Sequence, residues 1–179
     1  MRIAISGKSG CGNTTVSALL AQKLGIPVIN YTFRSLAADL GLSFEEVRRL
    51  AETSDEYDRM IDSRQVELAR EGPCVLASRL AIWMLEEADF RVFLDASEET
   101  RAARIQGREG GGLEDIRGAT RKRDAADSAR YRRLYGIDNG DTTRADLVID
   151  TERRSPEEIA ALIVAELRRR GLVPQTGAP

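Results

Sequence analysis

The sequence predicts an α/β protein in three layers, with a five-stranded parallel sheet flanked by helices on both faces. Two observations lead to this prediction. Five short apolar runs alternate with longer segments of helical spacing, the pattern of strands joined by crossover helices. A glycine-rich loop directly follows the first run. Ligands bind outside the carboxyl ends of parallel strands, so the loop stands where a ligand is expected.

The five apolar runs are short enough to be strands buried on both faces. Continuous apolar runs of this length, bounded by turn residues, are typical of such strands. They cover residues 2–6, 27–30, 74–77, 91–95 and 146–150.

The segments between the runs carry helix start and stop signals. The clearest helix begins with Ser155 as its cap and Pro156 in its first turn, and Gly171 ends it after a basic last turn. A second begins with a capping box at Ser43. The predicted helices cover residues 14–24, 43–51, 55–71 and 155–170.

The overall composition excludes several classes of protein. The 179 residues fit one domain, which we place at residues 1–173, followed by a polar tail at 174–179. A net charge of −2 gives no indication of a nucleic-acid or membrane partner. No apolar run approaches the roughly 18 residues that span a bilayer, and no signal-peptide pattern is visible, so we expect a cytoplasmic protein.

The residue types exclude some chemistry as well. The chain has no histidine, which removes Ser-His-Asp and Cys-His nucleophile systems and the usual zinc sites. Its two cysteines are too few for a disulfide framework. Chemistry in this protein therefore depends on carboxylates, arginine, lysine, backbone amides or a bound ion.

The glycine-rich loop is nearly the phosphate-binding pattern G-x-x-x-x-G-K-[ST]. Its glycines allow backbone N–H groups to converge on an anion, and the following helix adds its positive dipole end. A tight strand-to-helix turn with incidental glycines is the alternative. Thr14 stands at the position that ligates Mg²⁺ in such loops. The predicted phosphate-binding residues are Gly7, Lys8, Ser9, Gly10, Cys11, Gly12, Asn13, Thr14 and Thr15.

Asn13 stands where the pattern requires lysine, so the loop lacks its usual cation. Lys8 offers a replacement because its long side chain can fold over the loop toward bound phosphate. The loop resembles the GKGGxGKTT loop of the partitioning ATPases, whose early lysine reaches phosphate from across a dimer. We expect Lys8 to contact phosphate, within its own chain or across a dimer; a solvated loop lysine is the alternative.

Beyond the loop, the chain resembles a nucleoside monophosphate kinase, specifically the short cytidylate kinases common in archaea. The resemblance runs from residue 1 to about 168, and six stretches carry it in order: residues 31–37, 61–69, 78–83, 101–105, 130–138 and 155–158. It implies a P-loop NTPase fold with a helical NMP-binding segment at about 31–71 and a lid at about 107–135. It also implies ATP with Mg²⁺ as donor and CMP or dCMP as acceptor, in a monomer or weak dimer.

The resemblance assigns residues to the acceptor nucleotide. Arg34 and Arg79 correspond to arginines that bind the monophosphate, and bidentate arginines suit that task. Asp62 and Gln65, one turn apart, are expected to recognise the base. Ordinary surface positions would look the same.

The segment 117–133 carries seven basic residues against two aspartates, as expected of a lid that closes over phosphates. Arg123, Asp127 and Arg130 share one helical face and correspond to residues that hold the ribose or base and the phosphate. We expect Lys8, Arg121, Arg123 and Arg130 to stabilise charge during transfer. The alternative is a solvated helix with internal ion pairs.

A second departure from the family lies at the end of the third strand. Related kinases commonly carry an acidic residue there, whereas this chain reads Leu76-Ala77-Ser78-Arg79. Asp95 ends the fourth strand, but nothing in the sequence indicates that it substitutes. The predicted function is therefore a cytidylate kinase, with two alternatives: a nucleotide-binding or regulatory protein that has lost transfer, or a kinase of another substrate.

Overall fold

The five predicted strands form a single parallel sheet. In a computed structural model, which describes residues 1–175, the strand order is β2-β3-β1-β4-β5 and every pairing is parallel. Each predicted run overlaps an observed strand, so this prediction is confirmed. The strands are β1 Arg2–Ser6, β2 Val28–Ile29, β3 Cys74–Ala77, β4 Phe90–Asp95 and β5 Leu147–Asp150.

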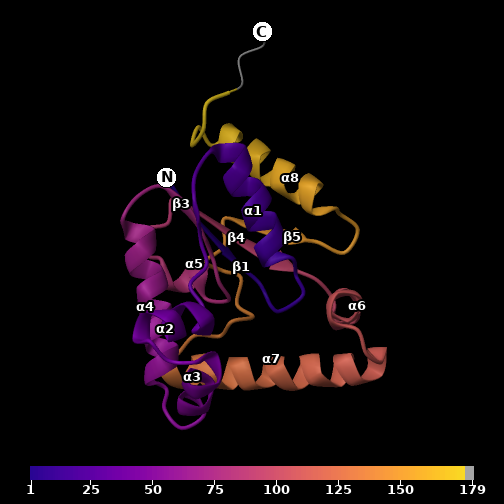
Figure 1. The fold of residues 1–179 in the computed structure, drawn as a ribbon. Helices are drawn as coiled ribbons and strands as arrows, with labels where there is room; N and C mark the ends of the chain where they lie inside the picture. The colour runs from indigo at the N-terminus through magenta and orange to yellow at the C-terminus, as the bar shows by residue number, and fades with distance from the viewer. Residues whose placement is uncertain (176–179) are drawn as a thin grey trace.

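Helices cover both faces of the sheet (Figure 1). One face packs against α1 and α8 through a buried cluster that includes Ile3, Ile5 and Ile163. The other packs against α4, α5 and the end of α7 through a cluster that includes Ala4 and Leu76. The helices are α1 Asn13–Leu24, α2 Phe33–Leu40, α3 Phe44–Ala51, α4 Glu56–Arg70, α5 Ala81–Met84, α6 Glu98–Glu109, α7 Leu113–Tyr135 and α8 Pro156–Arg169.

The local helix signals lie where the sequence places them. Ser43 and Ser155 each accept a hydrogen bond from the backbone N–H three residues on, and both capping boxes are complete. The polar tail predicted at residues 174–179 lies outside the described residues from position 176 onward. Within residues 1–175, no helix is long and apolar enough to cross a membrane.

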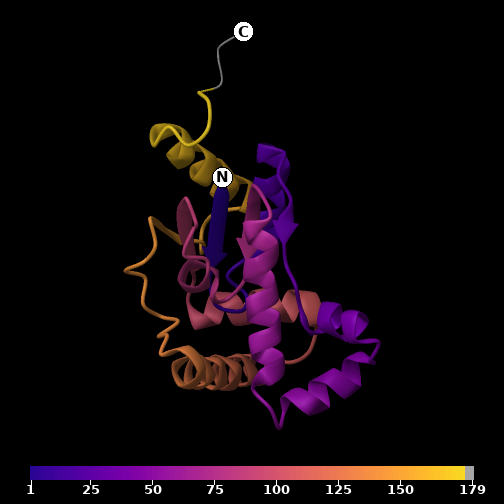
Figure 2. The same cartoon turned by 90° about the vertical axis from the view of Figure 1, so that its left-hand side faces the viewer.

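Helix α7 runs across the carboxyl end of the sheet, below the strands in the view of Figure 1. The view at right angles shows α2 and α3 beside the lower end of α4, on the same side of the molecule (Figure 2). At the carboxyl edge of the sheet, helices α4 and α7 therefore lie near the loop after β1 and the ends of β2 and β3.

Candidate active site

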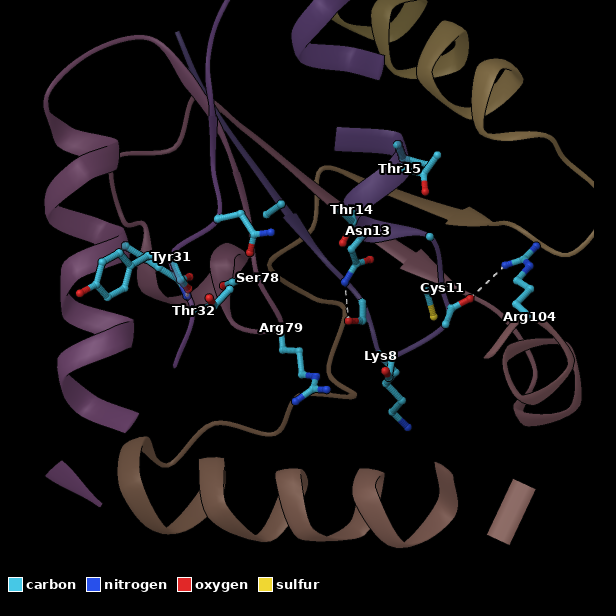
Figure 3. Close-up of a pocket in the computed structure, with 18 of the residues that line it drawn as sticks. Lys8, Cys11, Asn13, Thr14, Thr15, Tyr31, Thr32, Ser78, Arg79 and Arg104 are labelled. Atoms are coloured by element: carbon cyan, nitrogen blue, oxygen red, sulfur yellow. Dashed lines mark hydrogen bonds between the residues drawn. The ribbon is translucent and has the colours of Figure 1, made fainter. Parts of the chain in front are cut away.

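A cavity of about 720 Å³ opens at this edge of the sheet. The glycine-rich loop forms one wall, and residues 30–33 and 77–79, which follow β2 and β3, form another. Residues from α4, α6 and α7, together with Arg154 and the first turn of α8, complete the lining. Figure 3 shows the loop at one end, near Arg104, and Tyr31 and Thr32 at the other, with Arg79 between them.

The loop conformation requires glycine at positions 7 and 12 for different reasons. A Cβ on Gly7 would lie 2.4 Å from the carbonyl oxygen of Leu94, so the loop passes too close to β4 for a side chain. Gly12 has a φ of 98°, in the left-handed region that favours glycine. Helix α1 begins directly after Gly12, which directs its free N–H groups and positive dipole end at the cavity.

Asn13 supports the loop from within. Its Nδ2–H donates a hydrogen bond of 2.6 Å to the carbonyl oxygen of Gly7, and its Oδ1 is buried without a hydrogen-bond partner in the described part of the chain. The amide therefore closes the loop on itself and brings no charge to it.

Lys8 lines the cavity and is half-buried. Figure 3 shows its side chain extending from the loop toward α7, with no hydrogen bond to the other residues drawn. The Lys8 ammonium therefore lies on the side of the loop that faces the cavity. It brings a positive charge to a loop in which Asn13 is uncharged.

Two arginines on α6 contact the loop and a third lines the cavity, and none of them was predicted to be a site residue. Arg101 donates to the carbonyl oxygen of Ser9 at 3.1 Å, and Arg104 donates to that of Gly10 at 3.3 Å. Arg104 and Arg108 also line the cavity. Their spacing of three and four residues puts them on one helical face, a signal readable in the sequence.

The side of the cavity that carries Arg79 and Arg130 is a network of ion pairs. Arg79 pairs with Asp127 at 2.7 Å, and Arg130 pairs with Asp127 at 2.9 Å and with Asp58 at 3.5 Å. Asp127 is only 6% exposed, while both arginines line the cavity. Burial raises the pKa of the Asp58 carboxyl, and the Arg130 guanidinium opposes that rise. Asp127 thus fixes two guanidinium groups side by side at the cavity.

Four residues predicted for the acceptor, Arg34, Asp62, Arg123 and Asp127, lie outside the cavity lining. The Arg34 guanidinium stacks over the Phe44 ring at 4.4 Å, between α2 and α3. Asp62 accepts a hydrogen bond of 2.8 Å from the Tyr135 hydroxyl. Burial raises the pKa of Asp62 to about 6. Gln65, by contrast, lines the cavity as expected for a residue near the base.

The two arginines predicted to act from the lid differ in position. Arg121 pairs with Glu98 of α6 at 2.7 Å, and its hydrogen bonds help lower the pKa of Glu98 to about 2. Arg123 reaches the loop and donates to Ser9 Oγ at 3.4 Å. In this structure, α7 therefore touches the glycine-rich loop through Arg123 and not through Arg121.

The charge of the cavity wall is strongly positive. Among residues 1–175, six cationic side chains line it against a single carboxylate, that of Asp58. Ala77 stands at the end of β3, and Asp95 is exposed and outside the lining. Burial raises the pKa of the Cys11 thiol to about 11, so this loop cysteine stays protonated near neutral pH. Such a wall suits a polyanionic ligand.

The fold and the loop define an α/β protein of the P-loop NTPase class. Shikimate kinase from Bacteroides thetaiotaomicron has a similar fold, with a TM-score of 0.61 and 16% identity over 94% of this chain and 98% of that one. Deoxyadenosine kinase from M. mycoides gives a TM-score of 0.58 and 18% identity over 94% of this chain and 100% of its own.

Within that class, the chain belongs to the cytidylate kinase-like family, whose sequence model matches residues 2–153. A protein named cytidylate kinase 2 from Borreliella afzelii is 43% identical, over 96% of this chain and 99% of its own. The cytidylate kinase of Pyrococcus horikoshii is 39% identical, over 92% and 87%. The resemblance predicted from the sequence is confirmed.

Proposed function

We propose that this protein transfers the γ-phosphoryl group of ATP to CMP or dCMP and yields CDP or dCDP. The observation that carries this proposal is family membership over nearly the whole chain, with relatives named cytidylate kinases. The cavity supports it, because a phosphate-binding loop faces two guanidinium groups held by Asp127. The comparisons give no support to a protein that has lost transfer.

The reaction requires little covalent participation by the protein. An acceptor phosphate oxygen attacks the γ-phosphorus, the bond from the γ-phosphorus to the β,γ-bridging oxygen breaks, and ADP leaves with that electron pair. The attacking oxygen is already anionic, so no general base is needed. Positioning and charge stabilisation therefore supply most of the catalysis.

We assign each end of the cavity one nucleotide. The loop N–H groups, Lys8 and the start of α1 hold the donor phosphates, while Arg79 and Arg130 hold the acceptor phosphate. Arg123 already contacts the loop, so we assign it to stabilise the phosphoryl group during transfer.

Thr14 fits the expected Mg²⁺ ion. It lies exposed in the first turn of α1 and lines the cavity, so its hydroxyl is available to a hard cation. Mg²⁺ commonly takes its other ligands from substrate phosphates and water, which suits a wall where Ala77 offers no carboxylate. When bound, the ion neutralises charge on the donor phosphates.

We further propose that residues 31–71 form the acceptor segment and residues 107–135 a lid, within one domain of residues 1–173. Arg34 and Arg121 lie outside the cavity lining here. Contact of Arg34 with the acceptor phosphate therefore requires α2 to move toward the loop. Contact of Arg121 with the transferred group requires it to leave Glu98.

An ATP-dependent assay with CMP, dCMP, UMP and AMP tests the proposed function. The diphosphate product is separated by ion-exchange chromatography and quantified. We expect turnover with CMP and dCMP and much less with AMP. Absence of turnover with all four acceptors would refute the kinase activity.

A further inference from the structure

Arg101 is a buried arginine of α6 that contacts the glycine-rich loop without lining the cavity. Its side chain is 4% exposed. Its Nη1–H donates a hydrogen bond of 3.1 Å to the carbonyl oxygen of Ser9. Gly10 packs directly on the backbone of Arg101, because a Cβ on Gly10 would lie 2.9 Å from the Arg101 carbonyl oxygen. The loop therefore rests on α6 at Ser9 and Gly10.

The same guanidinium also binds α7. Its Nη2 pairs with Asp124 Oδ2 at 2.7 Å, and the Asp124 side chain is 15% exposed. Arg123, the preceding residue of α7, donates to Ser9 Oγ at 3.4 Å. Arg101 thus joins the loop to α7 through one buried side chain, at the loop residue that α7 itself contacts.

The bond from Arg101 fixes the direction of one peptide group of the loop. In a trans peptide the N–H points opposite to the C=O. Because Arg101 holds the Ser9 carbonyl toward α6, the Gly10 N–H points away from α6, and Gly10 lines the cavity. The next N–H, that of Cys11, donates to the Lys8 carbonyl oxygen at 3.1 Å, whereas no backbone acceptor within residues 1–175 takes the Gly10 N–H. The Gly10 N–H is therefore available to an anion in the cavity.

Stability alone explains this arrangement poorly. A buried ion pair pays desolvation for both charges, and well-packed apolar side chains in its place are often at least as stabilising. The Arg101 Nε–H is buried without a hydrogen-bond partner in the described part of the chain, which adds to the cost. A planar guanidinium can, however, hold a carbonyl and a carboxylate at fixed angles to each other. The geometry favours a role in orienting the loop.

We propose that Arg101 is a positioning residue for the donor phosphates, which holds the Gly10 N–H toward them and links this part of the loop to α7. The inference rests on the proposed function, because that function places the donor phosphates at the loop. Arg101 does not contact the nucleotide itself and acts through Ser9. Asp124 assists by keeping the guanidinium in place.

The test compares Arg101→Gln, Asp124→Asn and the double variant. The dissociation constant for ATP is measured by equilibrium dialysis with Mg²⁺ and without an acceptor, and stability by urea denaturation. Each single substitution leaves a buried charge without its partner, so both should lower the urea midpoint. The double variant removes both charges and should recover most of that loss.

ATP binding should not recover with stability. We expect the dissociation constant for ATP to rise about 10- to 100-fold in Arg101→Gln, the range of one hydrogen bond to a charged group, and to stay raised in the double variant. If ATP affinity returned together with stability, Arg101 would only hold the helices together and the proposal would be wrong. An unchanged dissociation constant in Arg101→Gln would also overturn it.

Two further measurements separate a local effect from a general one. The dissociation constant for CMP without ATP should be the same in the double variant and the unmodified protein; a loss as large as that for ATP would contradict the proposal. Asp124→Asn, whose amide oxygen can still accept from Arg101, should weaken ATP binding less than Arg101→Gln does. A larger loss would mean that Asp124, and not Arg101, orients the loop.

Arg117→Gln is the matched control. Arg117 pairs with Glu98 at 3.1 Å, so it also joins α7 to α6, and it lies outside the cavity lining. Its substitution should leave the dissociation constant for ATP unchanged. An equal loss of ATP affinity in Arg117→Gln would show that any loosening of α6 against α7 disturbs the loop, and would overturn the specific role of Arg101.

Failure of this inference and failure of the proposed function give different results. If ATP affinity depends on Arg101 as expected but no acceptor is phosphorylated, the kinase activity is wrong and the inference stands. If the protein phosphorylates CMP and Arg101→Gln binds ATP as the unmodified protein does, the inference is wrong and the kinase activity stands.

Discussion

The two ends of the cavity hold their positive charge in opposite ways. At the acceptor end, Arg79 and Arg130 are ion-paired to the buried carboxylate of Asp127. At the loop end, Arg104 donates to the carbonyl oxygen of Gly10 and to Thr151, and Lys8 extends into the cavity. The acceptor end is thus a nearly neutral network of ion pairs, while the loop end carries positive charge that is available to an anion.

Under the proposed function, this difference would explain how the loop can do without lysine at position 13. A buried ion pair fixes geometry but costs desolvation, so it favours precise placement over net attraction. Cations that face only backbone carbonyls and a hydroxyl keep their full attraction for phosphate. We infer that Lys8 and Arg104 together supply the charge that Asn13 lacks, and that Asn13 keeps only the task of bracing Gly7.

The largest effect is expected from Arg79→Ala at the acceptor end. The substitution removes a cation from the acceptor phosphate and leaves the buried Asp127 with one partner fewer. We expect kcat/KM for CMP to fall about 10³-fold or more, within the range of a phosphate-binding arginine in kinases. Steady-state kinetics with each substrate varied in turn measure it.

Arg79→Lys is the matched control, because it keeps the charge but not the planar fork. It should recover part of the loss. If only the KM for ATP changed, Arg79 would bind the donor nucleotide. The two ends of the cavity would then have the opposite roles.

Lys8→Ala tests the loop end. We expect kcat to fall about 10²-fold, near the lower limit for a cation that stabilises transferring phosphate, with the dissociation constant for CMP unchanged. Lys23→Ala is the control, since Lys23 is an exposed lysine in the last turn of α1. Unchanged kcat in Lys8→Ala would show that Lys8 is a solvated loop residue.

The sequence predicted the sheet and the caps because these follow local rules. Each strand is a short apolar run, and Ser43 and Ser155 satisfy helix-end N–H groups within three residues of themselves. The phosphate loop was predictable for the same reason. Arg79 was predictable because it follows a buried strand whose carboxyl end must lie at the ligand edge.

The side-chain positions that the sequence did not reveal depend on how helices far apart in the sequence pack together. Asp58 and Asp62 lie one turn apart on α4, and periodicity does not reveal which faces the cavity. That choice follows from the path of α7, which brings Tyr135 to Asp62 and Arg130 to Asp58. Arg34 was placed at the acceptor phosphate by resemblance, and its stacking on Phe44 depends on the packing of α2 against α3.

The substitution Asn13→Lys tests whether position 13 and Lys8 supply the same positive charge at the loop end. In the unmodified protein, we expect kcat to change by less than about tenfold, because Lys8 already supplies charge and the bond to Gly7 is lost. In the Lys8→Ala background, the same substitution should raise kcat by about tenfold. Such non-additivity is expected of residues that share one role. Equal effects in both backgrounds would mean that the two positions act independently.

The smallest effect concerns stability at the acceptor end. Burial raises the pKa of Asp62 to about 6, above its ordinary value of 3.8. Between these values the native state binds more protons than the unfolded state, so Asp62 makes the protein less stable as pH rises through that window. Asp58 and Arg130 also act on this carboxyl, and both remain in the variant.

Asp62→Asn removes the titration and keeps an acceptor for the Tyr135 hydroxyl. Urea denaturation gives the free energy of unfolding of the variant and of the unmodified protein at pH 4.5 and at pH 7. From the lower to the higher pH, the variant should gain about 1 kcal/mol relative to the unmodified protein. This value is smaller than the full pKa shift of Asp62 would give, because the side chain is partly exposed. Glu67→Gln, on the exposed side of α4, should show no such change. A pH-independent difference would mean that Asp62 is well solvated and that Tyr135 does not hold α7 against α4. The acceptor end would then be assembled by its arginine pairs alone.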